Sequence, residues 1–173
     1  MQAPKIPNNE IERLQVLREL LILDTPKEDR YDIITQYAAS LFGVEIALVS
    51  LVDENRQWFK SACGLDATET SREISFCGHA ILQDMPLIVE NALEDPRFAD
   101  NPLVTGPPHI RFYMGAPLTV HTQKMGTLCL IDSKPKKVDQ FQKQSLRDLA
   151  KLVEEVMVNR LLDAGAVAAK LKK

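Results

Sequence analysis

The spacing of apolar residues changes along the chain, and this change constrains the fold more than any other feature of the sequence. Apolar residues recur at helical spacing in residues 9–42 and again from Asp139 onward, whereas residues 44–132 contain segments with the alternation of β-strands. The predicted order is helix, helix, hairpin, short helix, strand, long loop, hairpin, helix. Hairpins flanked by helices favour an antiparallel sheet covered by helices, so we expect an α+β fold.

The first two predicted helices each carry an apolar stripe that we expect to be buried. The stripes are Ile11, Leu14, Leu17, Leu20 and Leu21 in the first helix, and Ile33, Ile34, Tyr37, Ala38, Leu41 and Phe42 in the second. Gly43 follows the second stripe and predicts a left-handed helix stop.

Residue pairs with the spacing of a capping box mark the predicted helix starts. In this motif a first side chain and one three positions later each accept a bond from the other's backbone N–H. The pairs are Asn9 with Glu12, Thr25 with Glu28, and Asp139 with Gln142, and Ser75 is a single predicted cap for a short helix over 76–82.

Two hairpins and one short strand make up the predicted sheet. The hairpins pair residues 44–52 with 57–63 and residues 110–120 with 125–132, and the short strand covers 87–90. Residues 66–74 are polar and are predicted to form a loop.

Residues 91–109 form a long irregular segment with four prolines and one glycine. Such loops in compact domains are usually functional or disordered, and the charged and aromatic residues here favour function. Asp95 to Phe98 has the composition of a tight turn with Phe98 anchored in the core. The prolines between 102 and 108 indicate a stiff wall for a pocket.

Composition excludes several classes of function. The 173 residues suggest one domain, and 21 basic residues against 24 acidic ones give a net charge of −3. Because no basic cluster is interleaved with aromatics, we expect no nucleic-acid partner. The longest apolar runs fall short of the ~18 residues that span a bilayer, so we expect no membrane insertion.

The termini and the cysteines indicate a cytoplasmic protein. The first residues contain no apolar core of signal-peptide length. Cys63, Cys77 and Cys129 are odd in number and widely spaced, which favours reduced thiols over a disulfide framework.

Six sequence blocks, in order, resemble the GAF domain, in the subgroup found beside bacterial histidine kinases and diguanylate cyclases. They are ILDTPKEDRYD, ALVSLVDENRQWFKSACGL, REISFCGHAI, EDPRFADNPLV, IRFYMGAPL and GTLCLID. The resemblance implies a domain over 9–161, with an N-terminal tail (1–8) and a C-terminal helical extension (162–173).

The resemblance also implies architecture and a class of function. GAF domains have a six-stranded antiparallel sheet with helices on both faces, the terminal helices packed together on one side, and a pocket roofed by loops on the other. They are usually sensory or regulatory modules, often dimeric through their terminal helices. They bind cyclic nucleotides, bilins, haem, small metabolites or no known ligand, and a few are enzymes. The ligand must therefore be argued from the site.

Arg111 and Tyr113 are the most suggestive candidates for a binding site. On a strand they point to one face and Phe112 to the other. Beneath the long loop they are placed to hold an anionic or carbonyl-bearing ligand. The structural alternative is that Arg111 pairs with an acid such as Asp95 or Asp100 and pins the loop.

Cys77 and His79 have several interpretations. With Cys129 they match no strong zinc pattern, and residues two apart on a helix do not face each other as a catalytic pair. Compared with phytochromes, Gly78 stands where a bilin-binding site has His beside Cys. The structural alternative is a small buried thiol near a pocket, with His79 bonded to backbone.

Two further readings come from named GAF relatives. Free methionine sulfoxide reductases use clustered cysteines, which keeps a redox enzyme using Cys77 as an alternative. The cyclic-nucleotide motif is imitated in part by Asn91, Phe98 and Asp100, but its Lys is missing.

The last predicted helix carries a seam of apolar residues close to a heptad pattern: Ala150, Val153, Met157, Leu161, Ala164, Ala168 and Leu171. Gly165 interrupts the seam. We expect its first part to pack on the first helix and the remainder to form a dimer stalk or to fray.

Together these observations predict a non-catalytic cytosolic sensory or regulatory domain that binds an unidentified small molecule under the 91–109 loop. Its partners are a second copy of the chain and an output kinase or cyclase; the alternatives are a thiol-dependent reductase and a ligand-free scaffold. No metal site is predicted and the cofactor is left open. The predicted ligand-binding residues are Phe76, Cys77, His79, Asp95, Arg97, Arg111, Tyr113 and Cys129.

Overall fold

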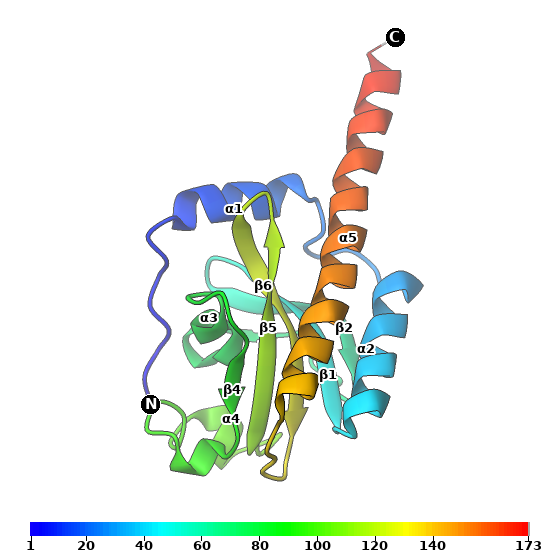
Figure 1. Ribbon diagram of the computed structural model, residues 1–173. Helices are drawn as coiled ribbons and strands as arrows, with labels where there is room; N and C mark the ends of the chain where they lie inside the picture. The colour runs from blue at the N-terminus through cyan, green and yellow to red at the C-terminus, as the bar shows by residue number, and fades with distance from the viewer. Residues whose placement is uncertain (173) are drawn as a thin grey trace.

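The computed structural model describes residues 1–172 and has helices on both faces of one sheet (Figure 1). In chain order the elements are α1 (Glu10–Glu19), α2 (Asp29–Phe42), β1 (Ile46–Val52), β2 (Arg56–Cys63), β3 (Glu69–Ser71), the 3-10 turn η1 (Arg72–Ile74), α3 (Phe76–Ala80), β4 (Leu87–Val89), the 3-10 turn η2 (Ala92–Glu94), α4 (Pro102–Thr105), β5 (Phe112–Val120), β6 (Gln123–Asp132) and α5 (Gln140–Leu171).

The six strands form one antiparallel sheet in the order β3-β2-β1-β6-β5-β4. The α+β class and both hairpins are confirmed. The β5–β6 turn is shorter than expected, because His121 and Thr122 adopt positive φ values of 47° and 66°. Two such residues form the tight hairpin turn that matches strand twist, so β6 begins at Gln123.

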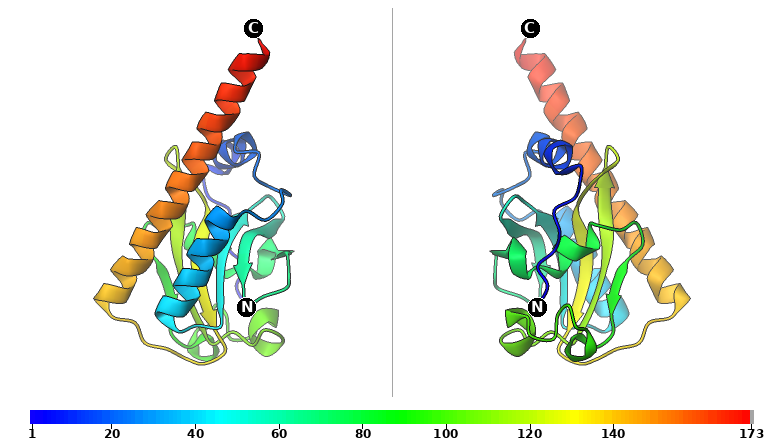
Figure 2. Two further views of the ribbon diagram at one scale, coloured as in Figure 1. Left: turned by 90° about the vertical axis from the view of Figure 1, so that its right-hand side faces the viewer. Right: turned by 90° about the vertical axis from the view of Figure 1, so that its left-hand side faces the viewer.

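The sheet separates two hydrophobic cores. Alternate strand residues divide between them: Val49 and Met114 face α2 and α5, whereas Leu48 and Tyr113 face α3 and the loops. Figure 2 shows α2 and α5 side by side over one face, with α3 on the other. The second core holds the candidate site.

The polar segment 66–74 is more ordered than its sequence predicts. It contains β3, which pairs with β2, and the turn η1. The long segment 91–109 likewise contains the turn η2 and helix α4. Short elements like these bury few side chains, so they leave no periodic signal.

The predicted capping boxes at Asn9 and Thr25 are wrong. The Asn9 side chain donates to Gln123 Oε1 at 2.5 Å and makes no cap bond. The Thr25 hydroxyl bonds to the Ile22 carbonyl at 2.5 Å, and α2 begins only at Asp29. Asn9 thus bonds to a residue of the β5–β6 hairpin, and the Thr25 hydroxyl also accepts a bond from Lys60 at 2.8 Å, so tertiary contacts use the side chains that the local pattern assigned to the helix backbone.

The other predicted helix boundaries are confirmed. Ser75 accepts a bond from the Gly78 N–H at the start of α3, and Gly43 ends α2 with a φ of 60°. Asp139 and Gln142 form the capping box of α5.

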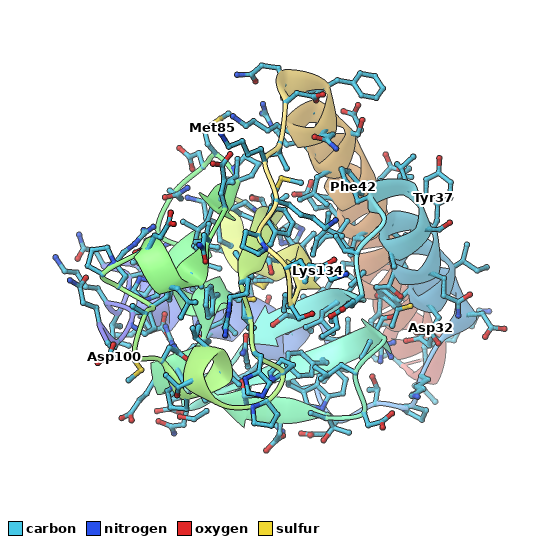
Figure 3. All side chains as sticks on the ribbon, turned by 90° about the horizontal axis from the view of Figure 1, so that it is seen from below. Asp32, Tyr37, Phe42, Met85, Asp100 and Lys134 are labelled. Atoms are coloured by element: carbon cyan, nitrogen blue, oxygen red, sulfur yellow. The ribbon has the colours of Figure 1, made fainter. Side chains whose placement is uncertain are left out.

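The predicted apolar faces of the first two helices are right only in part. In α1, Leu14 and Leu17 are buried, but Ile11 is exposed. In α2 the buried residues are Tyr31, Thr35 and Ala38. The remaining predicted apolar residues include an exposed stripe of Ile33, Tyr37 and Leu41, and Tyr37 projects away from α2 in Figure 3.

Helix α5 packs along α2 and β5 rather than along α1, which corrects the expected pairing. It touches the end of α1 through Arg160, whose guanidinium donates to the carbonyls of Leu20 and Leu21 at 3.0 and 2.6 Å. Gly165 does not break α5, which continues to Leu171 and projects beyond the sheet (Figure 1). None of the helices within residues 1–172 combines the length and apolar character needed to cross a bilayer.

Candidate functional site

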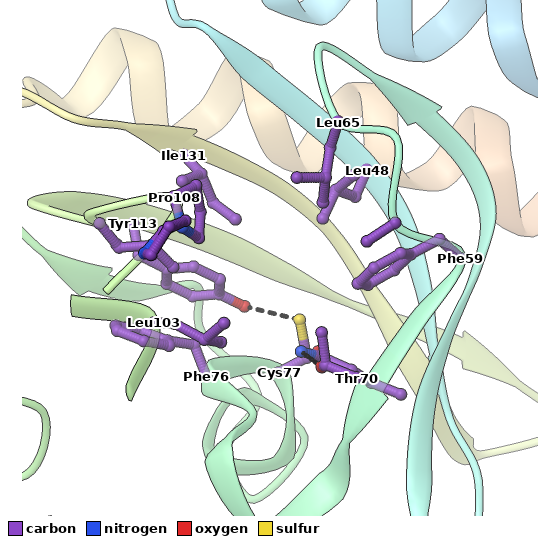
Figure 4. A pocket seen from close by; sticks show the side chains of 14 residues that line it. Leu48, Phe59, Leu65, Thr70, Phe76, Cys77, Leu103, Pro108, Tyr113 and Ile131 are labelled. Carbon is purple, nitrogen blue, oxygen red and sulfur yellow. Dashed lines mark hydrogen bonds between the residues drawn. The ribbon is translucent and has the colours of Figure 1, made fainter. Parts of the chain in front are cut away.

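A cavity of about 250 Å³ lies between the sheet and the segments that cover its α3 face. Strands β1, β2, β5 and β6 form one wall, and α3, α4 and a pair of prolines form the other (Figure 4). Its lining residues are Leu48, Gln57, Phe59, Leu65, Ala67, Thr70, Phe76, Cys77, Leu103, Pro107, Pro108, Ile110, Tyr113 and Ile131. The predicted role of the 102–108 prolines as a pocket wall is therefore right for Pro107 and Pro108, whereas Pro102 begins α4 and does not line the cavity.

The lining includes no Asp, Glu, Lys, Arg or His side chain. Its polar members are Gln57, Thr70, Cys77 and Tyr113. Gln57 already donates to the Thr70 hydroxyl at 2.5 Å. An anionic ligand here would lose its hydration without gaining a cationic partner, so the lining disfavours anions.

Cys77 is the chemically distinctive residue of the cavity. Its sulfur accepts hydrogen bonds from the Tyr113 hydroxyl at 3.3 Å and the Thr127 hydroxyl at 3.1 Å. Figure 4 shows Tyr113 and Cys77 pointing toward each other. The sulfur of Cys129 lies 3.9 Å behind that of Cys77, and both thiols are free and buried.

These contacts divide the two thiols into an acidic one and a weakly acidic one. Burial raises the pKa of Cys77, but hydrogen bonds from Cys129, Thr127 and Tyr113 outweigh burial and lower that pKa below its ordinary value. The hydrogen bond to Cys77 raises the pKa of Cys129, and burial raises it further. Cys77 is therefore the thiol that ionises first.

Gly115 makes the Tyr113–Cys77 contact possible. A Cβ at this position would collide with the Tyr113 hydroxyl and ring. Because residues two apart on a strand share a face, only glycine lets the ring lie along the sheet and reach α3.

An aromatic stack ties the long loop to α3. The rings of Phe76 and Phe98 lie 4.0 Å apart at 8°, and Phe76 also meets Tyr113 at 5.1 Å. Phe98 is fully buried, so its predicted role as the loop's anchor is confirmed. The stack therefore connects the loop to Phe76, which lines the cavity.

Three of the eight predicted site residues line the cavity: Phe76, Cys77 and Tyr113. Cys129 lies behind Cys77 and does not line it. Their role in ligand binding stays a prediction. Thr127 was not among the predicted site residues, although its place two residues before Cys129 puts both side chains on one face of β6.

Arg111 does not reach the cavity. Its guanidinium donates to the carbonyls of Val104 and Ile110 at 2.9 and 3.0 Å. The expected pairing with Asp95 or Asp100 is wrong, because both carboxylates have other partners. Arg111 still pins the loop, through carbonyls rather than through an acid.

The remaining predicted residues also lie outside the cavity lining. Asp95 and Arg97 form an ion pair at 2.7 Å within their own turn. His79 bonds to the Gln2 carbonyl at 3.0 Å, as the structural alternative expected, and burial lowers the pKa of its imidazole. Within residues 1–172 no three His, Cys, Asp or Glu side chains are placed to hold a metal ion.

Comparison with known proteins gives the family. A profile of the GAF domain matches residues 26–158, which is most of the chain. The chain belongs to the GAF domain family. It is 42% identical over 137 residues to the cyclic di-GMP phosphodiesterase PA2567 of Pseudomonas aeruginosa. That match covers 79% of this chain but only 23% of the relative.

Solved structures with the same fold have diverse roles. The GAF domain of an Acinetobacter phosphoenolpyruvate-protein phosphotransferase has a TM-score of 0.65 at 20% identity, covering 88% of this chain and 95% of that one. The PixJ GAF domain of Thermosynechococcus elongatus has a TM-score of 0.67 at 14% identity, covering 95% of this chain and 96% of that one. The free methionine-R-sulfoxide reductase of Neisseria meningitidis has a TM-score of 0.64 at 18% identity, covering 95% of this chain and 99% of that one. At these identities the likeness shows the fold alone.

Proposed function

We propose that this GAF domain is a cytoplasmic regulatory sensor that binds a small, neutral, largely apolar molecule in the cavity beside Cys77. The observation that carries the proposal is the largely apolar lining of that cavity, which includes no Asp, Glu, Lys, Arg or His side chain. It opposes the anionic ligand that Arg111 suggested, because this Arg is bonded to loop carbonyls. It also opposes a cyclic nucleotide, whose phosphate would find no cation in the lining.

The size of the cavity supports the same class of ligand. An apolar cavity of about 150 Å³ binds benzene, so a volume of about 250 Å³ accommodates a substituted aromatic ring. The rims formed by Leu65 and Leu103 are only partly buried, which leaves the cavity accessible from the loop side.

The relay we propose runs through the sheet to α5. Strand β5 carries Tyr113 on the cavity face, whereas its neighbours Phe112 and Met114 are in the core that includes α5. A ligand that moves Tyr113 therefore acts on residues beneath α5. We propose that α5 passes this shift to a second chain and to a kinase, cyclase or phosphodiesterase output; the name of the Pseudomonas relative supports the last of these.

The exposed stripe of Ile33, Tyr37 and Leu41 on α2 supports a homodimer. The three side chains are 65%, 56% and 51% exposed and follow each other at four-residue spacing on α2, the helix that packs against α5. Replacing Tyr37 with Glu is expected to shift the protein from dimer to monomer in multi-angle light scattering. A monomeric wild-type protein would contradict this part of the proposal.

The first experiment is native mass spectrometry of the protein purified from its own cytoplasm. We expect a small non-covalent mass that is lost on denaturing, and lower occupancy in Leu65→Trp, whose indole fills the cavity. Leu82→Trp, at an exposed site outside the lining, is the matched control. A phosphate-bearing ligand, or equal occupancy in both variants, would overturn the assignment, and an apo dimer would favour the scaffold alternative.

A thiol-dependent reductase remains the second candidate, because Cys77 and Cys129 lie 3.9 Å apart. Free methionine sulfoxide carries an ammonium and a carboxylate, for which the lining offers no counter-ion. We therefore expect no turnover of methionine sulfoxide with a dithiol reductant. Turnover that Cys77→Ser abolishes would establish the enzyme instead.

A further inference from the structure

We propose that Cys77 and Cys129 form an oxidisable pair, which an apolar organic hydroperoxide entering the cavity converts to a disulfide. This inference goes beyond the sensor proposal and holds with or without a resident ligand. It assigns the cavity floor a second chemistry, reversible thiol oxidation, and rests on three independent features of the site.

The first feature is the placement of the two sulfurs. Cys77 lines the cavity, and Cys129 lies 3.9 Å behind it with no exposed surface. A disulfide bond is about 2.0 Å long, so the sulfurs must approach by about 2 Å. Rotation about the Cα–Cβ bonds displaces a sulfur by that order, and α3, which carries Cys77, has only five residues.

The second feature is the difference in acidity between the two thiols. Hydroxyl groups of Tyr113 and Thr127 direct their protons at the Cys77 sulfur, which stabilises its thiolate. The thiolate is the nucleophilic form of cysteine. Cys129 keeps its proton and lies where a second thiol can attack an oxidised Cys77.

The third feature is the selectivity of the approach. Cys77 is 2% exposed, so a reagent reaches its sulfur through the cavity. The apolar lining favours an oxidant with a hydrocarbon group, and about 250 Å³ exceeds the roughly 150 Å³ that encloses benzene. Cumene hydroperoxide, a substituted benzene, matches both requirements.

The reaction balances in two steps. The Cys77 thiolate attacks the terminal oxygen of the hydroperoxide: an S–O bond forms, the O–O bond breaks, and the leaving alkoxide takes up the proton that Cys77 released on ionising. The Cys129 sulfur then attacks the Cys77 sulfur: the S–S bond forms, the S–O bond breaks, and hydroxide leaves with the Cys129 proton as water. Two thiols are oxidised, and one hydroperoxide is reduced to an alcohol and water.

The test is to treat the fully reduced protein with cumene hydroperoxide and measure its intact mass under denaturing conditions. We expect the loss of two hydrogen atoms, a Cys77–Cys129 disulfide in the peptide map, and reversal by dithiothreitol. Cys63→Ser is the matched control, since this half-buried thiol lies outside the cavity lining, and it is expected to behave as wild type.

Variants separate the roles of the two thiols. In Cys129→Ser oxidation should stop at a Cys77 sulfenic acid that dimedone traps, and in Cys77→Ser the remaining buried thiol should not react. At mildly acidic pH, where the fraction of Cys77 present as thiolate limits the rate, disulfide formation in Tyr113→Phe should be several-fold slower than in wild type. The wild-type peptide map needs no variant, so the proposal is testable even if a substitution unfolds the domain.

Several results would overturn the proposal. They are an unchanged wild-type mass, a disulfide that involves Cys63, or hydrogen peroxide reacting faster than cumene hydroperoxide at equal concentration, which would remove the role of the apolar cavity. Failure here leaves the sensor proposal standing, because that depends on a bound molecule in native mass spectrometry. An empty cavity in that experiment leaves the present proposal standing.

Discussion

Replacing Glu10 with Gln should destabilise the domain strongly at neutral pH and hardly at all in strong acid. Glu10 accepts two hydrogen bonds from Arg13, each of 2.8 Å, and a third from Arg72. The side chains of both arginines are at least nine-tenths buried, at 1% and 5% exposed. Without the carboxylate, two buried positive charges lose their counter-ion.

The magnitude follows from the pKa of Glu10. Burial raises this pKa, but the hydrogen bonds and charges of Arg13 and Arg72 outweigh burial and lower it from 4.5 to about 2. A difference of about 2.5 pKa units corresponds to about 3 kcal/mol of folding free energy. Because the folded pKa is the lower one, this stability is complete above pH 4.5 and is lost as pH falls toward about 2.

The assay is urea unfolding of wild type and Glu10→Gln across this pH range. The difference in free energy of unfolding should be about 3 kcal/mol at neutral pH, fall to about half near pH 3 and to a few tenths of a kcal/mol at about pH 2. Glu12→Gln, an exposed residue in the same first turn of α1, controls for the helix dipole. A Glu10→Gln difference that stays constant with pH would refute the reasoning.

Three further predictions concern packing and helix ends. Phe98→Ala should lower the melting temperature by about 10 °C, because it deletes a fully buried ring worth about 3–5 kcal/mol, whereas Phe141→Ala, at an exposed site, should leave it unchanged in calorimetry. Arg160→Ala should cost about 1–2 kcal/mol and speed hydrogen exchange in the last turns of α5, since its two bonds to the Leu20 and Leu21 carbonyls just after α1 are lost. Asp139→Ala should cost about 1 kcal/mol in urea unfolding by removing the cap of α5, and an unchanged midpoint would contradict this role.

The fold was predictable where local chemistry and tertiary structure agree. Ser75, Gly43 and the Asp139–Gln142 pair cap or stop helices through bonds to residues only a few positions away in the chain. Asn9 and Thr25 have the same local pattern, but the Asn9 amide bonds to Gln123 of the hairpin and the Thr25 hydroxyl accepts a bond from Lys60. Local sequence does not record that competition, so it misplaced the start of α2.

Some residues of the site could be predicted from the sequence, but the contacts between them could not. Alternation along β5 correctly placed Tyr113 opposite Phe112. The meeting of Cys77 with Cys129 joins residues 52 apart through the docking of α3 on β6, which no periodicity encodes. The charge of Arg111 suggested an anion site, and only the structure shows that loop carbonyls already use its donors.

The projecting end of α5 turns small movements into large ones. With 32 residues the helix is about 48 Å long, and its buried contacts lie in the first part, up to Met157. A tilt of about 5° about its start moves the far end by about 4 Å. A small repacking beneath Val153 that tilts the helix would thus displace its far end by most of a helical turn. The longer the helix, the larger this displacement is for a given tilt.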